Sequence, residues 1–313
     1  MRLGFGLPVA GGWATPENMV AVAREAESLG YHSLWTVQRI LYPRAPRNEY
    51  AGSPGGPWPA YFQTVADGLV ALTYVAAATS RIRLGTAVVN LPYYSPVLLA
   101  KQLATLDVVS GGRLTVGAGV GWSEDEYVAI GVPFRRRGRR MDECLRCLKA
   151  VWTEELVEFE GEFYVIPASR IDPKPVQRPH PPVLVGGYSP AAVRRAVSLA
   201  DGYLGGNVPL AELAPVIERV RTVARDAGRD PDDVPIVARG AVSLRDEPTG
   251  LRRRPLFGSL EEVREDVDRY RESGVTELFL DLNFDERIAA PGVDPDDALA
   301  VARRLLAALA PSG

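Results

Sequence analysis

The sequence predicts an α/β protein of the (β/α)8 TIM-barrel class, folded as one domain over residues 1–313. Strand-like and helix-like segments alternate along the chain, and eight strands, each followed by a helix, fit within 313 residues. The strand segments are short, apolar and β-branched, as is typical of strands buried on both faces of a parallel sheet. A doubly wound open sheet is the alternative. Its GxGxxG fingerprint is missing after the first strand, where the chain reads LPVAGG.

The first half of the chain supplies four of the predicted strands. Thr15 is a good helix cap and Pro16 suits the first helical position, so a helix begins there and ends before Gly30. A loop rich in Pro, Gly and Tyr, residues 41–61, interrupts the alternation. The predicted strands are 2–7, 33–37, 81–89 and 113–117, and the predicted helices are 16–29, 65–79 and 97–109.

The second half continues the alternation after an arginine-rich turn at 135–140. A short hairpin over 158–165 and a proline-rich excursion over 167–182 are inserted before the fifth strand. Ser259 caps an amphipathic helix that ends at Ser273. The predicted strands are 183–185, 202–204, 235–244 and 277–282, and the predicted helices are 139–152, 190–200, 210–227, 259–273 and 296–309.

The bulk composition argues against several classes of partner. A net charge of −3 and a pI near 5.7 give no reason to expect binding to nucleic acid or to an anionic membrane. No segment reaches the roughly 18 apolar residues that a membrane helix needs. The first six residues read as a strand rather than as a secretory leader. We therefore expect a cytoplasmic protein that acts on a small-molecule substrate.

Cys144 and Cys147 form a CxxC pair inside a predicted amphipathic helix. A redox pair of this type lies at a helix start, where the thiolate is stabilised. A zinc site would need two more ligands, and the two histidines, His32 and His180, are distant in sequence. We expect both cysteines to pack in the core, and we expect no metal.

The ends of the predicted strands indicate the chemistry, because a barrel carries its active site at the carboxyl ends of its strands. These ends are rich in glycine and aromatic residues, with no Ser–His–Asp set, no carboxylate cluster and no lysine. That pattern argues against hydrolysis, metal catalysis and Schiff-base chemistry. An isomerase would need a base, and only Glu247 and Glu286 come near. A redox cofactor, which carries its own reactivity, fits such a site.

Two segments are candidates for binding a phosphate or another anion. Gly186-Gly187-Tyr188-Ser189 leads from a strand into a helix that starts at Pro190, so its backbone can approach a phosphate at the helix start. A plain strand–turn–helix with a serine cap is the alternative. Arg252-Arg253-Arg254 follows the seventh strand, where barrels often bind phosphate, and a solvated charged face is its alternative.

Eight sequence motifs together cover nearly the whole chain. Each motif alone is common to many proteins, whereas all eight in this order are typical of one family. They are AREAESLGYHSLWT (23–36), RIRLGTAVV (81–89), SPVLLAKQLATLDVVSGGRLTVGAGVGWSEDEY (95–127), GRRMDE (138–143), FEGEFY (159–164), PKPVQRPHPPVLVGGYSP (173–190), ADGYL (200–204) and GSLEEVREDVDRYRESGVTELFL (258–280). In this order they resemble the bacterial-luciferase-like superfamily (LLM class) of flavin- and coenzyme F420-dependent oxidoreductases.

The resemblance implies an oxidoreductase built on a barrel with insertions, which binds FMN or coenzyme F420 at the mouth. It also implies a bulge behind the cofactor ring at residues 87–90, often with a non-prolyl cis peptide. Members are commonly homodimers, with helices and loops near strands two to four at the interface. The implied cofactor contacts are Val88, Val89, Asn90, Gly119, Val120 and Trp122 around the ring, Gly186, Gly187, Tyr188 and Ser189 at the phosphate, and Arg252 and Arg253 as further candidates.

One departure from the family pattern follows the second strand. Many members carry Asp-His there, with the histidine near the reacting edge of the ring, whereas this chain has Gln38-Arg39. Neither side chain is a good proton donor near neutral pH. The departure therefore argues against a histidine-assisted alcohol or sugar-phosphate dehydrogenation. Gln38 and Arg39 are expected at the ring edge, where they would hydrogen-bond the cofactor or a substrate anion.

The two cofactors imply different reactions. Coenzyme F420 transfers a hydride, whereas FMN, reduced by a separate reductase, activates O₂ for monooxygenation. Three of the 36 basic residues are lysine, and this arginine bias suggests an actinobacterial source, where F420 is common. Arg252–Arg254 and Arg287 would then meet its acidic tail. We favour F420-dependent hydride transfer, with an FMN monooxygenase or a non-catalytic cofactor-binding barrel as alternatives. The aromatic loop 41–61 is expected to cover the substrate.

Overall fold

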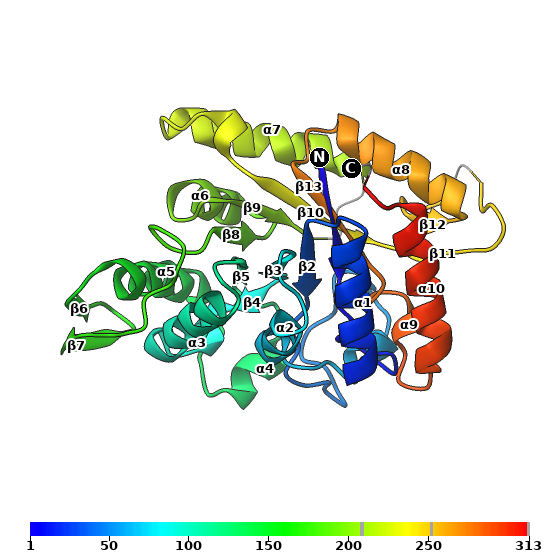
Figure 1. The fold of residues 1–313 in the computed structure, drawn as a ribbon. Coiled ribbons are helices and arrows are strands. Elements are labelled where there is room, and N and C mark those ends of the chain that lie inside the picture. The colour runs from blue at the N-terminus through cyan, green and yellow to red at the C-terminus, as the bar shows by residue number, and fades with distance from the viewer. Residues whose placement is uncertain (207–209, 251–252, 312–313) are drawn as a thin grey trace.

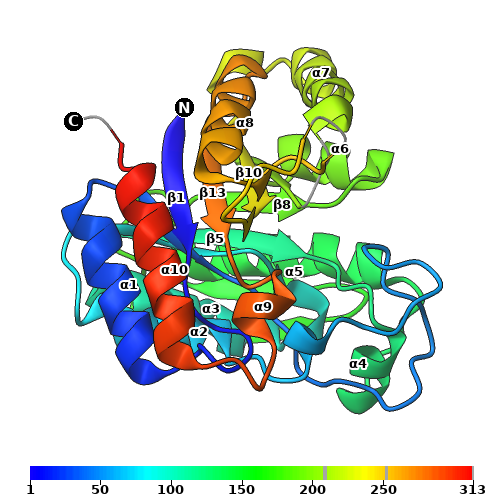
Figure 2. The ribbon, with the colours of Figure 1, turned by 90° about the vertical axis from the view of Figure 1, so that its right-hand side faces the viewer.

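Eight parallel strands close into a barrel in the computed structural model, which describes residues 1–206, 210–250 and 253–311. Helices connect the strands and form the outer layer (Figures 1 and 2). This architecture confirms the predicted (β/α)8 TIM-barrel class. In order around the barrel the strands are β1 (Arg2–Gly6), β2 (Ser33–Thr36), β3 (Arg83–Thr86), β5 (Leu114–Gly119), β8 (Val183–Gly186), β9 (Gly202–Gly205), β10 (Ile236–Ala241) and β13 (Glu277–Asp281), which pairs with β1.

The helices surround the barrel, and the first and last of them lie side by side (Figures 1 and 2). Among the described residues, no helix is long and apolar enough to cross a membrane. The α-helices are α1 (Pro16–Ser28), α2 (Gly68–Ala76), α3 (Pro96–Val109), α4 (Glu124–Ala129), α5 (Arg137–Thr153), α6 (Pro190–Ser198), α7 (Leu210–Asp226), α8 (Leu260–Glu272), α9 (Glu286–Ala289) and α10 (Pro295–Ala308).

Three further strand pairings lie outside the eight-stranded barrel. A two-residue strand, β4 (Val89–Asn90), adds to the end of β5. The antiparallel hairpin of β6 (Val157–Glu160) and β7 (Val165–Ser169) projects away from the barrel (Figure 1). Beyond β10, β11 (Ser243–Leu244) pairs with β12 (Phe257–Gly258) and brings the ends of the long loop before α8 together.

The centre of the barrel is filled by an apolar cluster that includes two stacked aromatic rings. Trp35 and Phe279 stack with ring centroids 5.1 Å apart. A larger hydrophobic core fills the space between the strands and the surrounding helices. The interior cluster consists of Trp35, Ala87, Leu184, Leu204, Val237 and Phe279, with Val88 packed against it. The barrel is therefore filled with side chains rather than hollow, as is usual for this fold.

The predicted helix starts at Thr15 and Ser259 are confirmed. The Thr15 side chain accepts a hydrogen bond from the backbone N–H of Asn18, and Pro16 opens α1. Ser259 and Glu262 form a reciprocal capping box at the start of α8. The helix predicted over 65–79 instead begins at Gly68. The Asp67 side chain caps it by accepting hydrogen bonds from the backbone N–H groups of Leu69 and Val70.

Two predicted strands are interrupted, and two short helices were not predicted. The strand expected over 81–89 divides into β3 and β4 around a cis peptide bond between Ala87 and Val88, inside the segment where the resemblance implies such a bond. The strand expected over 235–244 divides into β10 and β11. Helices α4 and α9 were missed because six and four residues are too few to show a helical period.

The two cysteines pack inside α5, as expected. Both side chains are buried, and burial raises the pKa of the Cys147 thiol to about 12 and that of Cys144 further still. Both are therefore protonated thiols that fill core volume. No group of three or more potential metal ligands occurs among the residues that the structure describes.

Candidate active site

The mouth of the barrel is the end at which the carboxyl ends of its strands lie. The residues that follow β3 form one wall of this mouth, and glycines from β5 and β8 approach Val88 there. A Cβ atom on Gly119 would lie 2.4 Å from Val88 Cγ2, and one on Gly186 would lie 3.2 Å from Val88 Cγ1. A side chain on Gly119 would therefore displace Val88. Three of the predicted contacts thus meet at one place, and the wall that they form is smooth enough to face a flat ring.

Gln38 fixes the backbone next to this wall. Its Oε1 accepts a hydrogen bond of 2.8 Å from the backbone N–H of Asn90, and its Nε2 donates to the Tyr94 hydroxyl at 2.5 Å. Val89 is buried beside it in β4. Gln38 therefore lies next to Val89 and Asn90, and both ends of its amide already have protein partners.

Arg39 is buried beneath the aromatic loop. Its Nη2 lies 3.3 Å from Glu126 Oε2, and its guanidinium carbon lies 4.7 Å from the Trp122 ring centroid. Glu126 also accepts from the Tyr93 hydroxyl at 2.7 Å, which holds the carboxylate in place. Arg39 is only 8% exposed, yet its Nη1 has no hydrogen-bond partner. An unsatisfied buried donor of this kind points to a ligand contact at the mouth.

Trp122 joins the end of β5 to the loop over 41–61. Its ring lies 4.6 Å from that of Trp58 and 5.2 Å from that of Tyr50, and Phe62 packs on the same cluster. Nearby, the Val120 carbonyl accepts a hydrogen bond from the Tyr127 hydroxyl. These contacts hold the aromatic loop over the end of β5.

Arg239 is a site residue that the sequence reasoning missed. It lies on β10, its Nε is 3.1 Å from Asp281 Oδ2, and its Nη2 donates to the Ala87 carbonyl behind the wall. Its guanidinium carbon is 4.7 Å from the Phe284 ring centroid. Among the described residues, none is hydrogen-bonded to its Nη1. The signal was present in the sequence, since IVARGA places a charged residue in the middle of an apolar strand.

Three tyrosines lie within electrostatic range of Arg239. Burial raises the pKa of Tyr50 and of Tyr188, and the positive charge of Arg239 partly opposes both shifts. Burial also raises the pKa of Tyr61, and the neighbouring Tyr50 adds to this shift. All three are protonated at neutral pH. The mouth therefore presents hydrogen-bond donors rather than a base.

The segment 186–189 has the geometry of an anion cradle. Gly187 has φ of +130°, a conformation that other residues rarely adopt, and Ser189 caps α6 by accepting from the Ala192 N–H at 3.2 Å. Within the described part of the chain, no acceptor is bonded to the Ala191 N–H, the first amide of α6. The positive end of the helix is therefore open to a phosphate.

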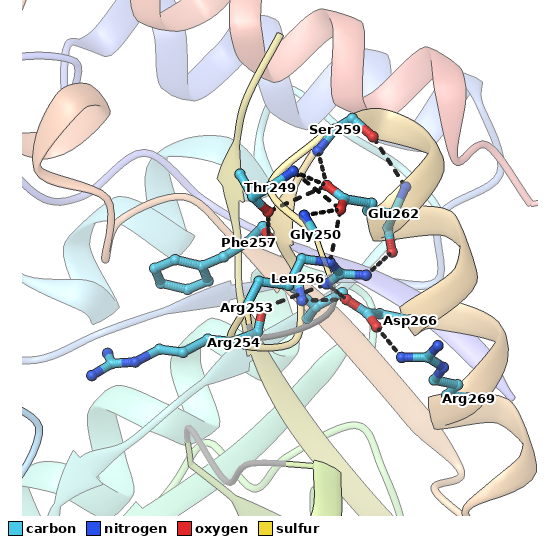
Figure 3. A network of polar contacts seen from close by, with 10 residues as sticks. All are labelled: Thr249, Gly250, Arg253, Arg254, Leu256, Phe257, Ser259, Glu262, Asp266 and Arg269. Atoms are coloured by element: carbon cyan, nitrogen blue, oxygen red, sulfur yellow. Dashed lines mark hydrogen bonds and ion pairs between the residues drawn. The ribbon is translucent and has the colours of Figure 1, made fainter. Parts of the chain in front are cut away.

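The arginines of 252–254 differ in what they contact. Arg252 lies outside the described residues. Arg253 is bound to α8: its Nη1 pairs with the Asp266 carboxylate, and its Nε is 3.3 Å from Glu262 Oε1 (Figure 3). Arg254 is exposed and points to the opposite side of the loop, next to Phe257 (Figure 3). Arg287 is paired with Asp285 at 2.9 Å. Of the described arginines in the run, Arg254 is thus the one left free to meet an anion.

The chain also matches known proteins. The family model described as luciferase-like monooxygenase matches residues 3–255. An uncharacterized protein of Mycobacterium tuberculosis is 34% identical over 293 residues, which cover 93% of both chains. The crystal structure of the monooxygenase RslO1 from Streptomyces bottropensis superposes with a TM-score of 0.79 at 25% identity, covering 98% of both chains.

Relatives with named activities use two different cofactors. An FMNH(2)-dependent dimethylsulfone monooxygenase of Pseudomonas putida is 37% identical over 155 residues, 49% of this chain and 42% of its own length. An F420-dependent glucose-6-phosphate dehydrogenase of Kineococcus radiotolerans is 32% identical over 193 residues, 60% of this chain and 52% of its own length. The family match spans most of the barrel and agrees with the resemblance in the motifs. The chain therefore belongs to the luciferase-like monooxygenase family and is an oxidoreductase.

Proposed function

We propose that this oxidoreductase uses coenzyme F420 to reduce a small organic substrate by hydride transfer beneath the aromatic loop. The observation that carries the proposal is the pair of donors at the mouth, the Arg239 guanidinium and the Tyr50 hydroxyl. Neither histidine lies there, since His32 precedes β2 and His180 precedes β8. Donors without a base suit the addition of a hydride and a proton to a C=O, C=N or C=C bond, rather than their removal from an alcohol.

The residues at the mouth fit a flat ring with a phosphorylated side chain. Val88 packs directly against Gly119 and Gly186, and the flat ring would lie against the surface that they form, with the unpartnered Nη1 of Arg39 offering it a hydrogen bond. The segment 186–189 at the start of α6 would hold the phosphate, and Arg254 would meet a carboxylate of the tail. The reduced deazaflavin supplies a hydride from C5 of its ring. The remaining ring contacts would be Val89, Asn90, Gly119, Val120 and Trp122.

The substrate's polar atom is held by Arg239 and Tyr50. Tyr61 lies close enough to Tyr50 for each to shift the pKa of the other, so its hydroxyl is next to the proposed proton donor. As the hydride bonds to the substrate carbon, the π electrons move to the oxygen or nitrogen, which takes the proton of Tyr50. Water then restores that proton through Tyr61. The Arg239 charge stabilises the negative charge that develops during the transfer.

An FMN-dependent monooxygenase is the second candidate. It is supported by the 25% identity to RslO1 over nearly the full chain and by the dimethylsulfone monooxygenase relative. The aromatic cover of Tyr50, Trp58 and Trp122 would keep water away from the oxygenated cofactor. This reading requires a separate flavin reductase as partner, and O₂ as co-substrate.

A homodimer through α2 and α3 completes the proposal. These two helices pack against each other and expose apolar side chains on their outer face. Val70 is 68% exposed and Leu98 is 65% exposed, next to the exposed Tyr74 and Val109. An apolar face of this kind marks an interaction surface, and a second copy of the chain matches it by symmetry.

Turnover under anaerobic conditions separates the two candidates. Purified protein is mixed with reduced F420 and a panel of enones, imines and ketones, and the return of the oxidised deazaflavin absorbance is followed. We expect substrate-dependent oxidation of F420 without oxygen. Oxidation that requires FMN, a reductase and O₂ would instead establish the monooxygenase, and binding of F420 with no turnover of any panel member would support the non-catalytic alternative.

A further inference from the structure

A cavity of about 660 Å³ lies at the end of the barrel opposite the mouth. It is lined by residues at or just before the starts of β1, β2 and β3, and it lies beside Met1 and Pro311. Its volume falls within the range of small-molecule sites. It is lined by Met1, Arg2, Leu3, Glu27, Ser28, Gly30, Tyr31, His32, Arg81, Ile82, Arg83, Arg271 and Pro311.

The lining holds four arginines and one histidine against one glutamate, Glu27, and the Glu277 carboxylate lies next to two of these side chains, Arg2 and His32. Glu27 accepts backbone N–H groups of Ser80, Arg81 and Ile82 at 2.6–3.2 Å. Glu277 Oε1 accepts from the Ser33 hydroxyl at 2.5 Å and from the Trp35 indole at 2.9 Å. These bonds from neutral donors leave the negative charge of both carboxylates in place, so two carboxylates stand against four guanidinium groups and one imidazole.

The guanidinium groups keep unused donors. Arg83 is half-buried and bonds only neutral oxygens, those of Thr115, Leu114 and Gln177 at 2.9–3.3 Å. Arg2 has its nearest carboxylate oxygen 4.0 Å away, on Glu277. The Arg81 side chain is exposed and forms no hydrogen bond or ion pair with any residue that the structure describes. Three cations thus face one cavity, and among the described residues the nearest carboxylate oxygen to any of their guanidinium groups is that of Glu277, 4.0 Å from Arg2 Nε.

These cations repel one another in the free protein. Burial lowers the pKa of Arg83; the Glu277 carboxylate opposes this shift, and the charge of Arg2 adds to it. Strand pairing enforces the closeness, because β1 pairs with β2 and β2 pairs with β3 through Ser33. An anion seated between them would remove the repulsion and satisfy the unused donors. Planar guanidinium groups match phosphate oxygens especially well.

We propose that this cavity binds a small ligand that carries a pyrophosphate or a similar phosphate group between Arg2, Arg81 and Arg83. Arg271 contributes little charge, because its guanidinium is paired with Asp268. The site is separate from the mouth, so a ligand here does not compete with the cofactor phosphate at the segment 186–189. It also stands independently of the proposed hydride transfer.

Calorimetric titration of the full chain with inorganic pyrophosphate at low ionic strength tests this proposal. We expect saturable binding to one site, weakened at least tenfold by Arg83→Gln and by Arg81→Gln. The control Arg146→Gln removes an exposed arginine on α5 and should bind like the wild type. If Arg83→Gln does not fold, Arg81→Gln alone tests the proposal. The Arg81 side chain forms no hydrogen bond or ion pair with any residue that the structure describes, so its replacement should leave the fold intact.

Three outcomes would overturn the proposal. The first is an absence of binding by the wild type up to millimolar pyrophosphate. The second is equal weakening by all three variants, which would reflect general charge rather than a site. The third is binding that survives Arg81→Gln and Arg83→Gln but is lost in Ser189→Ala, which would place the pyrophosphate at the mouth.

Discussion

Arg239 and Asp281 form a buried ion pair beside the proposed substrate position. Asp281 is 2% exposed, so burial raises its pKa, and the charge of Arg239 opposes that shift. Removing one partner of a buried pair leaves an uncompensated charge that costs about 3–5 kcal/mol. Arg239 therefore contributes to the stability of the barrel as well as to the site, and its replacement would mix the two effects. Tyr50 gives a cleaner test of the chemistry.

Replacing Tyr50 with phenylalanine should lower kcat about 100-fold, because a positioned general acid contributes on that order. KM and cofactor affinity should change little, since the ring and its packing on Trp122 remain. Steady-state kinetics of reduced F420 oxidation measures both parameters. Tyr164→Phe, at the hairpin of β6 and β7, is the matched control and should behave like the wild type, because its hydroxyl has no hydrogen-bond partner among the described residues. An unchanged kcat for Tyr50→Phe would remove Tyr50 from the proton-transfer role.

At the scale of elements, the approach of β5 to β3 shapes the wall of the mouth. In Gly119→Ala the new Cβ would lie 2.4 Å from Val88 Cγ2, so Val88 must move. Overpacking of this kind destabilises by about 1–3 kcal/mol. We expect a lower urea midpoint and weaker cofactor binding. Gly292→Ala, where the added Cβ has open space, should affect neither. Wild-type cofactor affinity in a folded Gly119→Ala protein would contradict this placement of the ring.

Glu262 on helix α8 accepts hydrogen bonds from the loop before the helix, and these bonds predict that the stability of the fold depends on pH. Backbone hydrogen bonds from Thr249, Ser259 and Gly250 outweigh desolvation and lower the pKa of Glu262 to about 2, from an ordinary 4.5 (Figure 3). The carboxylate therefore stabilises the fold fully above about pH 4.5, and this stability is lost as the pH falls towards 2.

Glu262→Gln should accordingly unfold more easily than the wild type at pH 7. The difference between the two proteins should shrink steadily below about pH 4.5. Urea midpoints measured between pH 7 and pH 3 report this trend. Glu261→Gln, one residue earlier on the same helix, should track the wild type throughout. A gap between Glu262→Gln and the wild type that stays constant with pH would refute the assigned role.

The elements that could be predicted well from the sequence are those with strong local signals. The helix starts at Thr15 and Ser259 have side-chain caps, and the barrel strands are apolar and β-branched. The division of strand 81–89 was implied by the family resemblance rather than by local propensity, which favours one continuous strand. The role of Arg239 could not be predicted, because it depends on contacts with Ala87 and Asp281, which are distant in sequence. Contacts of that kind cannot be inferred from periodicity.

At the scale of the whole molecule, the exposed face of α2 and α3 predicts the oligomeric state. Val70→Glu combined with Leu98→Glu places charges on both helices, and burying them in an interface would be costly. Sedimentation of the wild type should report a dimer, and the double variant should sediment as a folded monomer. A wild-type monomer, or a double variant that remains dimeric, would contradict an interface at this face.

The two ends of the barrel have different chemical character. The mouth combines glycine, aromatic rings and hydrogen-bond donors, whereas the opposite end gathers arginines around a cavity. The hydride-transfer proposal rests on the mouth, and above all on which cofactor it selects. That choice decides between a reductase that needs no oxygen and an oxygenase that requires it.

Titration of the purified protein with each cofactor, followed by quenching of cofactor fluorescence, tests this choice most directly. The account predicts saturable binding of coenzyme F420, weakened in Gly119→Ala and unchanged in Gly292→Ala, with FMN binding much more weakly. Tight, saturable binding of FMN without binding of coenzyme F420 would contradict it.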